Sequence, residues 1–128
     1  MRGKILAVDD EPDQLALVEL LLTEAGFDVG TAPNGVAAIE KVRQNRPDLI
    51  VLDVSMPQMN GFTFCEMMRQ SAATATIPII FLTGLRSHFD RLNGYAHGGT
   101  AYLTKPFATD ELVDKVLELL HASKTGKA

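Results

Sequence analysis

The sequence predicts an α/β domain in which a parallel sheet lies between two layers of helices. Five short apolar stretches of strand length alternate along the chain with segments of helical spacing. The central stretch, residues 48–53, has four apolar residues between Asp48 and Asp53, which is typical of a strand buried on both faces. Strands that alternate with helices are joined by right-handed crossovers within one parallel sheet. No internal repeat or interdomain linker interrupts the pattern.

Length and composition indicate one small cytoplasmic domain. The chain has 128 residues and a net charge of −4, so we expect a domain over residues 1–122 and a flexible tail over 123–128. No apolar run approaches the ~20 residues of a membrane helix, and the start does not resemble a signal peptide. The single cysteine, Cys65, fits a reducing compartment. The chain lacks runs of Lys or Arg, which argues against direct binding of nucleic acid.

The first half of the chain predicts three strands and two helices. We expect strands at 5–8, 27–31 and 48–53, and helices at 13–24 and from 37 to about 45. Pro12 suits the first turn of the first helix, with Asp10 or Glu11 as its N-cap, and Gly26 suits its C-cap. Asn34 is the expected cap of the second helix. The apolar set of the first helix is wider than one stripe, so one or two leucines should be exposed.

The second half predicts two strands and three helices. We expect strands at 77–82 and 101–103, and helices at 62–70, 86–96 and 110–121. Pro78 is tolerable only near the start of its strand, and Thr109 is the expected cap of the last helix. Phe64, Met67 and Met68 are available to the core.

Polar residues gather where four of the five strands end. Asp9-Asp10 follow the first strand, Asp53 ends the third, Thr83 follows the fourth and Lys105 the fifth. The carboxyl ends of parallel strands share one edge, so these side chains should converge. Clustered carboxylates repel one another unless they are protonated or bridged by a cation, and carboxylates are among the ligands that Mg²⁺ prefers. With a lysine and a hydroxyl nearby, such a set suits a phosphoryl group that a carboxylate attacks.

These residues, in this order, give the chain its resemblance to the CheY-like receiver domain of two-component response regulators. The resemblance covers Lys4 to about His121 and rests on four segments: Val8-Asp9-Asp10-Glu11-Pro12, Asp53 with Met56-Pro57 and Gly61, Thr83-Gly84, and Tyr102-Leu103-Thr104-Lys105-Pro106-Phe107. It implies a flavodoxin-like (βα)5 three-layer sandwich with a five-stranded parallel sheet in strand order 2-1-3-4-5.

The resemblance also implies a phosphorylation-activated signalling switch. Asp53 would accept a phosphoryl group from a histidine kinase or a phosphotransfer protein in a reaction that needs Mg²⁺, with Mn²⁺ as an alternative. Asp10 and Asp53 would bind the metal directly, Asp9 through water, and Ser55 through its backbone carbonyl. The domain would catalyse only its own phosphorylation and dephosphorylation.

Further roles follow from the same resemblance. Lys105 would pair with the phosphoryl oxygens, Thr83 would be the switch hydroxyl, and Tyr102 would be the aromatic residue that turns inward with it. The bond before Pro106 is expected to be cis. Two loop residues, Pro57 and Gly61, would be structural.

The output surface implied by the resemblance is formed by the fourth helix, fifth strand and fifth helix. It would control a downstream partner or domain, as a monomer or as a phosphorylation-dependent dimer. The sequence is compatible with a stand-alone receiver and with the N-terminal domain of a longer regulator.

Two residues flank the expected phosphoryl site and would tune its lifetime. Ser55 lies two residues after Asp53, and Leu85 lies two residues after Thr83. Leu85 offers no polar group to orient an attacking water, so we expect slow loss of the phosphoryl group.

Three other functions share parts of this pattern. A metal-dependent phosphatase of the haloacid-dehalogenase type also uses an Asp nucleophile, but it would normally carry a second Asp at the position of Ser55. A flavodoxin-like FMN protein needs a phosphate loop where the acidic Asp9 and Asp10 stand. A receiver used only for binding is disfavoured because every expected site residue is present.

Overall fold

The computed structural model describes residues 3–53, 61–83, 101–104 and 107–124, which form a five-stranded parallel sheet with helices on both sides. The strands are β1 (Lys4–Val8), β2 (Asp28–Ala32), β3 (Leu49–Asp53), β4 (Ile79–Thr83) and β5 (Ala101–Thr104). Their order in the sheet is β2-β1-β3-β4-β5, and every neighbouring pair is parallel. This order confirms the predicted flavodoxin-like topology.

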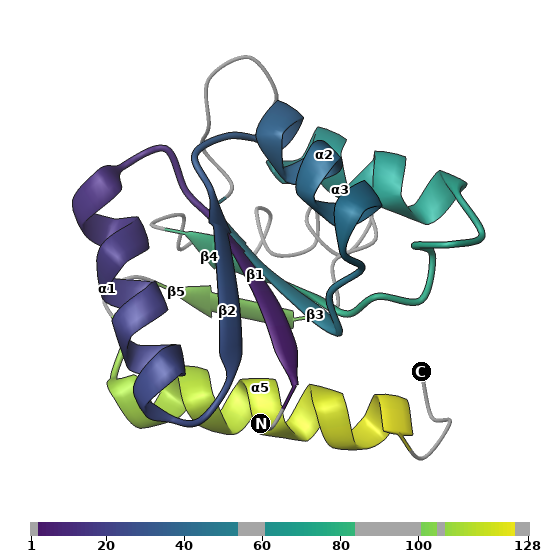
Figure 1. The fold of residues 1–128 in the computed structure, drawn as a ribbon. Coiled ribbons are helices and arrows are strands. Elements are labelled where there is room, and N and C mark those ends of the chain that lie inside the picture. The colour runs from purple at the N-terminus through teal and green to yellow at the C-terminus, as the bar shows by residue number, and fades with distance from the viewer. Residues whose placement is uncertain (1–2, 54–60, 84–100, 105–106, 125–128) are drawn as a thin grey trace.

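Helices cover both faces of the sheet (Figure 1). The described helices are α1 (Pro12–Glu24), α2 (Gly35–Gln44), α3 (Gly61–Gln70) and α5 (Thr109–Lys124). One buried cluster joins α2 and α3 to the sheet, and a second joins α1 and α5 to its other face. The helix expected at 86–96 lies outside the described residues. No helix in the described ranges is both long and apolar enough to span a bilayer.

β3 connects the two buried clusters. All five of its residues are buried. Ile50 and Leu52 belong to the cluster under α2 and α3, whereas Leu49 and Val51 belong to the cluster under α1 and α5. Successive side chains of a strand point to opposite faces, so a strand with helices on both sides must be apolar throughout. The continuous apolar run in the sequence therefore reflects the burial of β3 on both faces, as predicted.

The ends of α1 and α2 follow the predicted capping signals. Glu11 occupies the N-cap of α1 ahead of Pro12, although its side chain makes no capping bond. After the last turn, Gly26 adopts a φ of 100°, a left-handed conformation that glycine accepts without strain. Asn34 caps α2, because its Oδ1 accepts a hydrogen bond from the backbone N–H of Ala37 at 2.8 Å.

Some expected boundaries are wrong by one or two residues. β4 begins at Ile79 rather than at Ile77, and Pro78 stands before the strand, where its carbonyl accepts the N–H of Ile50 at 3.0 Å. α5 begins at Thr109, so Thr109 is not its cap. At that end the N–H of Ala108 donates to Oε1 of Glu111 at 2.9 Å, which is one half of a capping box.

Helix exposure agrees with the sequence at most positions. Leu17 and Leu20 of α1 are 46% and 53% exposed, which confirms that its apolar set is wider than its buried stripe. Phe64 and Met68 are buried as expected, but Met67 is 40% exposed and is not part of the core. α5 continues to Lys124, beyond the end expected at residue 121.

Candidate functional site

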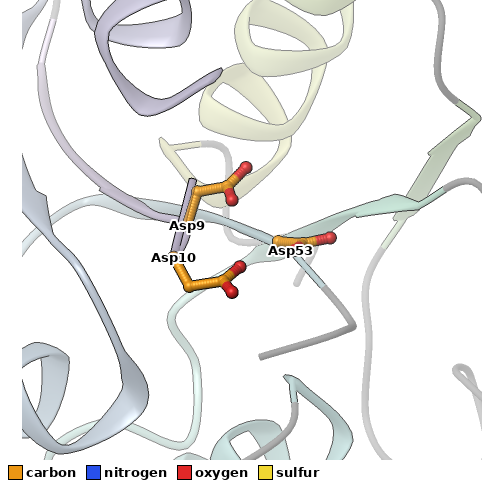
Figure 2. A group of neighbouring side chains, drawn as sticks. All are labelled: Asp9, Asp10 and Asp53. Carbon is orange, nitrogen blue, oxygen red and sulfur yellow. The ribbon is translucent and has the colours of Figure 1, made fainter. Parts of the chain in front are cut away.

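The acidic group forms at the carboxyl edge of the two central strands. Val8 of β1 is paired in register with Leu52 of β3. Asp9 and Asp53 are the next residues on these neighbouring strands, so they emerge side by side, and Asp10 follows at once. Figure 2 shows the three carboxylates together, and one oxygen from each lies within 4.8 Å of the others. The predicted convergence of these three residues is confirmed.

The three carboxylates differ in their burial. Asp9 is 3% exposed and Asp53 is 6% exposed, whereas Asp10 is exposed to solvent. Oδ1 of Asp9 accepts a hydrogen bond from the backbone N–H of Glu11 at 3.0 Å, which orients this carboxylate at the start of α1. Sequence reasoning missed this bond, although an Asp two residues before a helix N-cap is a signal for it.

The chemistry of this donor set fits a hard divalent cation. Carboxylates this close repel one another when all are ionised, and a bound cation removes the repulsion. Carboxylate oxygens are the ligands that Mg²⁺ prefers, and Mg²⁺ usually keeps several waters beside them. Asp10 is itself exposed to solvent, whereas the other two carboxylates are buried.

Strand register brings Thr83 to the same edge. Asp53 is paired with Leu82 of β4, and Thr83 is the last residue of that strand. Thr83 is in turn paired with Thr104, the last residue of β5. The end of β4 therefore lies beside the end of β3, as the sequence predicted.

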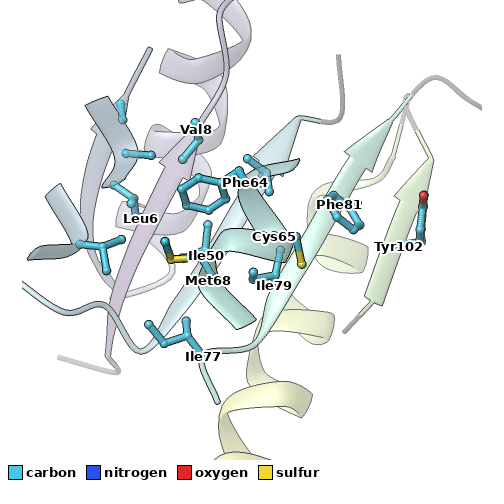
Figure 3. Close-up of a cluster of buried hydrophobic side chains, with 14 residues drawn as sticks. Leu6, Val8, Ile50, Phe64, Cys65, Met68, Ile77, Ile79, Phe81 and Tyr102 are labelled. Carbon is cyan, nitrogen blue, oxygen red and sulfur yellow. The ribbon is translucent and has the colours of Figure 1, made fainter. Parts of the chain in front are cut away.

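Tyr102 lies in the buried cluster under α2 and α3. It is 9% exposed, and its ring packs against that of Phe81, its neighbour in register, with centroids 5.4 Å apart and planes inclined by 50° (Figure 3). Tyr102 is therefore a buried residue of the domain core, and its switching role stays a prediction.

Other predicted site residues lie outside the described part of the chain: Ser55, Pro57, Leu85, Lys105 and Pro106. Their roles stay predictions. Gly61 is described only as the first residue of α3.

Cys65 belongs to the core and not to the site. Its side chain is fully buried in the cluster under α2 and α3. Burial raises the pKa of the Cys65 thiol to about 11, although the nearby Arg69 opposes the shift. A thiol in this state is a weak nucleophile, so Cys65 serves as a packing residue.

Comparison with known proteins agrees with this site. The chain matches the family described as Response regulator receiver domain over residues 5–117. It is 40% identical over 117 residues to the DNA-binding dual master transcriptional regulator RpaA of Synechocystis sp., which covers 91% of this chain and 48% of that protein. Among solved structures it is similar to the chemotaxis protein CheY4 of Vibrio cholerae, with a TM-score of 0.87, 36% identity, and coverage of 91% of this chain and 98% of that chain.

A further solved structure bears on the acidic edge. The receiver domain of the sensor histidine kinase PA1611 from Pseudomonas aeruginosa has a magnesium ion coordinated in its active site cleft. It is similar to this chain with a TM-score of 0.86 and 28% identity, over 93% of this chain and 98% of that chain.

A parallel sheet in this order, with an acidic group at its carboxyl edge, defines a signalling domain of the receiver type. The chain belongs to the receiver-domain family of two-component response regulators, whose members are switched by phosphorylation. The matched relatives are regulators and not phosphatases, so the phosphatase alternative is not supported. The chain spans about half of the length of the regulators RpaA and PhoP, 48% and 51% respectively.

Proposed function

We propose that Asp53 is the phosphoacceptor of this receiver domain. Its carboxylate is buried at the end of the central strand, where the packing of β3 on both faces holds it at the edge of the sheet. One oxygen each from Asp9, Asp10 and Asp53 lie within 4.8 Å of one another, close enough for the three residues to share a metal ion. The observation that carries the proposal is this grouping, because it combines a fixed nucleophile with ligands for a cation that neutralises phosphoryl charge.

The proposed reaction is a direct transfer to the Asp53 carboxylate. One carboxylate oxygen attacks the phosphorus of a phosphohistidine on the kinase or on a phosphotransfer protein. An O–P bond forms as the P–N bond breaks, and the leaving imidazole takes up a proton. The product is an acyl phosphate on Asp53, and its hydrolysis returns the carboxylate. We propose that the domain catalyses only its own phosphorylation and dephosphorylation.

We propose that Mg²⁺ is the physiological metal of the site and that Mn²⁺ can replace it. Asp10 and Asp53 would hold the ion directly, Asp9 through water, and Ser55 through its backbone carbonyl. When bound, the ion supplies positive charge to the phosphoryl oxygens. The oxygen-only donor set and the magnesium ion in the similar PA1611 receiver domain support this assignment.

We propose that three residues convert phosphorylation into a change of shape. The phosphoryl group adds roughly −1.5 to −2 charge and strong acceptor oxygens. Lys105 would pair with these oxygens and Thr83 would donate its hydroxyl to them, and Tyr102 would follow Thr83. The position of Thr83 at the end of β4, next to β3, supports its part.

We propose the output of this receiver domain from its similarity to longer regulators. RpaA is a DNA-binding regulator about twice as long as this chain, so we propose that the receiver controls an output domain or a separate partner. The surface involved would be the segment after β4 together with β5 and α5. Ser55 and Leu85 would set the lifetime of the phosphorylated state.

Incubation with acetyl phosphate and Mg²⁺, read by intact mass, tests the phosphoacceptor assignment. The wild-type chain should gain about 80 Da, the mass of one phosphoryl group, and EDTA should prevent the gain. Asp53→Asn should show no adduct. The matched control Asp48→Asn, directly before the opposite end of β3, should be modified like the wild type. A wild-type chain that stays unmodified, or an Asp53→Asn variant that is modified equally, would refute the assignment.

A further inference from the structure

A groove with an apolar floor lies between the C-terminal halves of α2 and α3. The buried apolar part of the lining is Val42 and Met68, each 5% exposed, and the half-buried Ile39, Met67, which is 40% exposed, and the buried Thr74 also line the groove. The groove has a volume of about 350 Å³. We call it the α2–α3 groove. The two helices lie side by side on the sheet face opposite α1 and α5 (Figure 1).

The α2–α3 groove lies away from the phosphoacceptor site. In a strand-helix-strand unit the helix returns antiparallel to the strands, so its C-terminal end lies near the start of the next strand. Gln44 ends α2 and Gln70 ends α3, shortly before β3 and β4 begin. The groove therefore lies toward the amino edge of the sheet, while Asp53 is at the carboxyl edge. The proposed function does not use it.

Two arginines, Arg43 and Arg46, line the groove. Nε of Arg46 donates to the carbonyl of Ala73 at 2.9 Å, and Nη2 donates to Oγ1 of Thr76 at 3.4 Å. These bonds hold the guanidinium in place and use two of its five N–H donors. In the part of the chain that the structure describes, neither arginine forms an ion pair, and no Asp or Glu lines the groove.

The charge of the groove is opposite to that of the whole chain, whose net charge is −4. The acidic residues of the same helices, Glu40 and Glu66, do not line it. Glu40 instead accepts a hydrogen bond from Nε2 of Gln44 at 3.4 Å. An apolar floor with a cationic rim is complementary to a ligand that is apolar in one part and anionic in another.

We propose that the α2–α3 groove binds a short acidic segment of a partner protein. An apolar side chain of the segment would enter between Ile39 and Met67, and a neighbouring carboxylate would pair with Arg43 or Arg46. Methionine side chains adapt to different apolar partners, and charge-assisted bonds to arginine add specificity. A segment suits the groove better than a small molecule, because a groove that leaves Met67 40% exposed does not enclose a small ligand as ordinary pockets do.

Selection from a random-peptide phage library on the immobilised full chain tests this proposal. Enriched peptides are then titrated calorimetrically into the wild type, Arg43→Glu, Met67→Gln and Lys41→Glu. Lys41 is the matched control, since it lies in the last turn of the same helix but does not line the groove. All variants are checked for their fold by circular dichroism and for labelling by acetyl phosphate.

The proposal predicts enriched peptides in which an apolar residue lies next to Asp or Glu. Arg43→Glu should weaken their binding on the order of tenfold or more, Met67→Gln should also weaken it, and Lys41→Glu should bind like the wild type. Failure to enrich peptides, or peptides that bind Arg43→Glu as tightly as the wild type, would overturn it. Saturable binding of decanoate without peptide binding would overturn it in favour of a small amphipathic anion.

Discussion

The carboxylates of Asp9, Asp10 and Asp53 lie close enough for each negative charge to raise the electrostatic cost of the other two. Their oxygens come within 4.8 Å, and two of the three residues are almost fully buried, so water screens them only in part. A bound cation would offset the repulsion among these carboxylates. Metal binding and folding stability should therefore be linked at this site.

Substitution of Asp10 measures this linkage. In EDTA, Asp10→Asn should melt on the order of a few degrees higher than the wild type, because it removes one of three repelling charges. Mg²⁺ at about 100 times its Kd should stabilise the wild type by about 2.7 kcal/mol and Asp10→Asn much less. Thermal unfolding followed by circular dichroism gives both values.

The control is Asp13→Asn, which removes the same charge from the first turn of α1 but lies outside the acidic group. It should keep the full response to Mg²⁺. An equal response in Asp10→Asn and the wild type would exclude Asp10 as a ligand.

The buried thiol of Cys65 makes the free energy of unfolding depend on pH in the alkaline range. Its pKa is raised from 9.0 to about 11 in the folded state, mainly by burial, so folding favours the neutral thiol. The corresponding stability is complete below pH 9 and is lost as the pH rises toward 11. Over this window the free energy of unfolding should fall by up to about 3 kcal/mol more in the wild type than in Cys65→Ala. Urea unfolding at several pH values measures the difference, and parallel curves for the two proteins would contradict it.

At the scale of the element, α2 shows how one side chain fixes where a helix begins. The Oδ1 of Asn34 accepts the N–H of Ala37 at 2.8 Å, and α2 starts at Gly35, a residue with poor helix propensity. The cap therefore stabilises a first turn that the helix sequence itself does not favour.

Replacing this cap should weaken the whole domain. Asn34→Ala should lower the free energy of unfolding by about 1 kcal/mol, measured by urea denaturation. Asn34→Asp keeps an acceptor at the same place and should stay near the wild-type value. If Asn34→Ala were as stable as the wild type, the hydrogen bond would not be what holds this end of α2.

Helix ends marked by a capping side chain in the sequence could be predicted, and ends that are fixed in other ways could not. The N-cap of α2 was evident from Asn34, although the helix begins at Gly35 and not at 37 as expected. The delayed start of β4 was not, because Pro78 has no N–H for the ladder and its carbonyl instead serves Ile50 of β3. Ala108 has no capping side chain, and the acceptor comes from Glu111 within the helix.

At the scale of the whole molecule, the apolar runs and the alternation of elements were sufficient to predict a parallel sheet covered on both faces. They also placed Asp9, Asp10 and Asp53 on one edge, because parallel strands end together. The α2–α3 groove could not be predicted, since the exposure of Met67 depends on how two helices pack. Sequence spacing alone had assigned Met67 to the core.

Because the topology brings three carboxylates to one edge of the sheet, the modified residue must be identified separately. Three carboxylates lie within 4.8 Å of one another, so an adduct mass alone does not say which of them was modified. An acyl phosphate can be reduced with borohydride, which leaves homoserine in place of the modified aspartate.

Peptide mapping after acetyl phosphate, Mg²⁺ and borohydride treatment is the most direct test of the central claim. The account predicts homoserine in place of Asp53 and unmodified aspartate at Asp9 and Asp10. Reduction at Asp9 or Asp10 instead, or no reduction in a chain that carries the adduct, would contradict Asp53 as the phosphoacceptor.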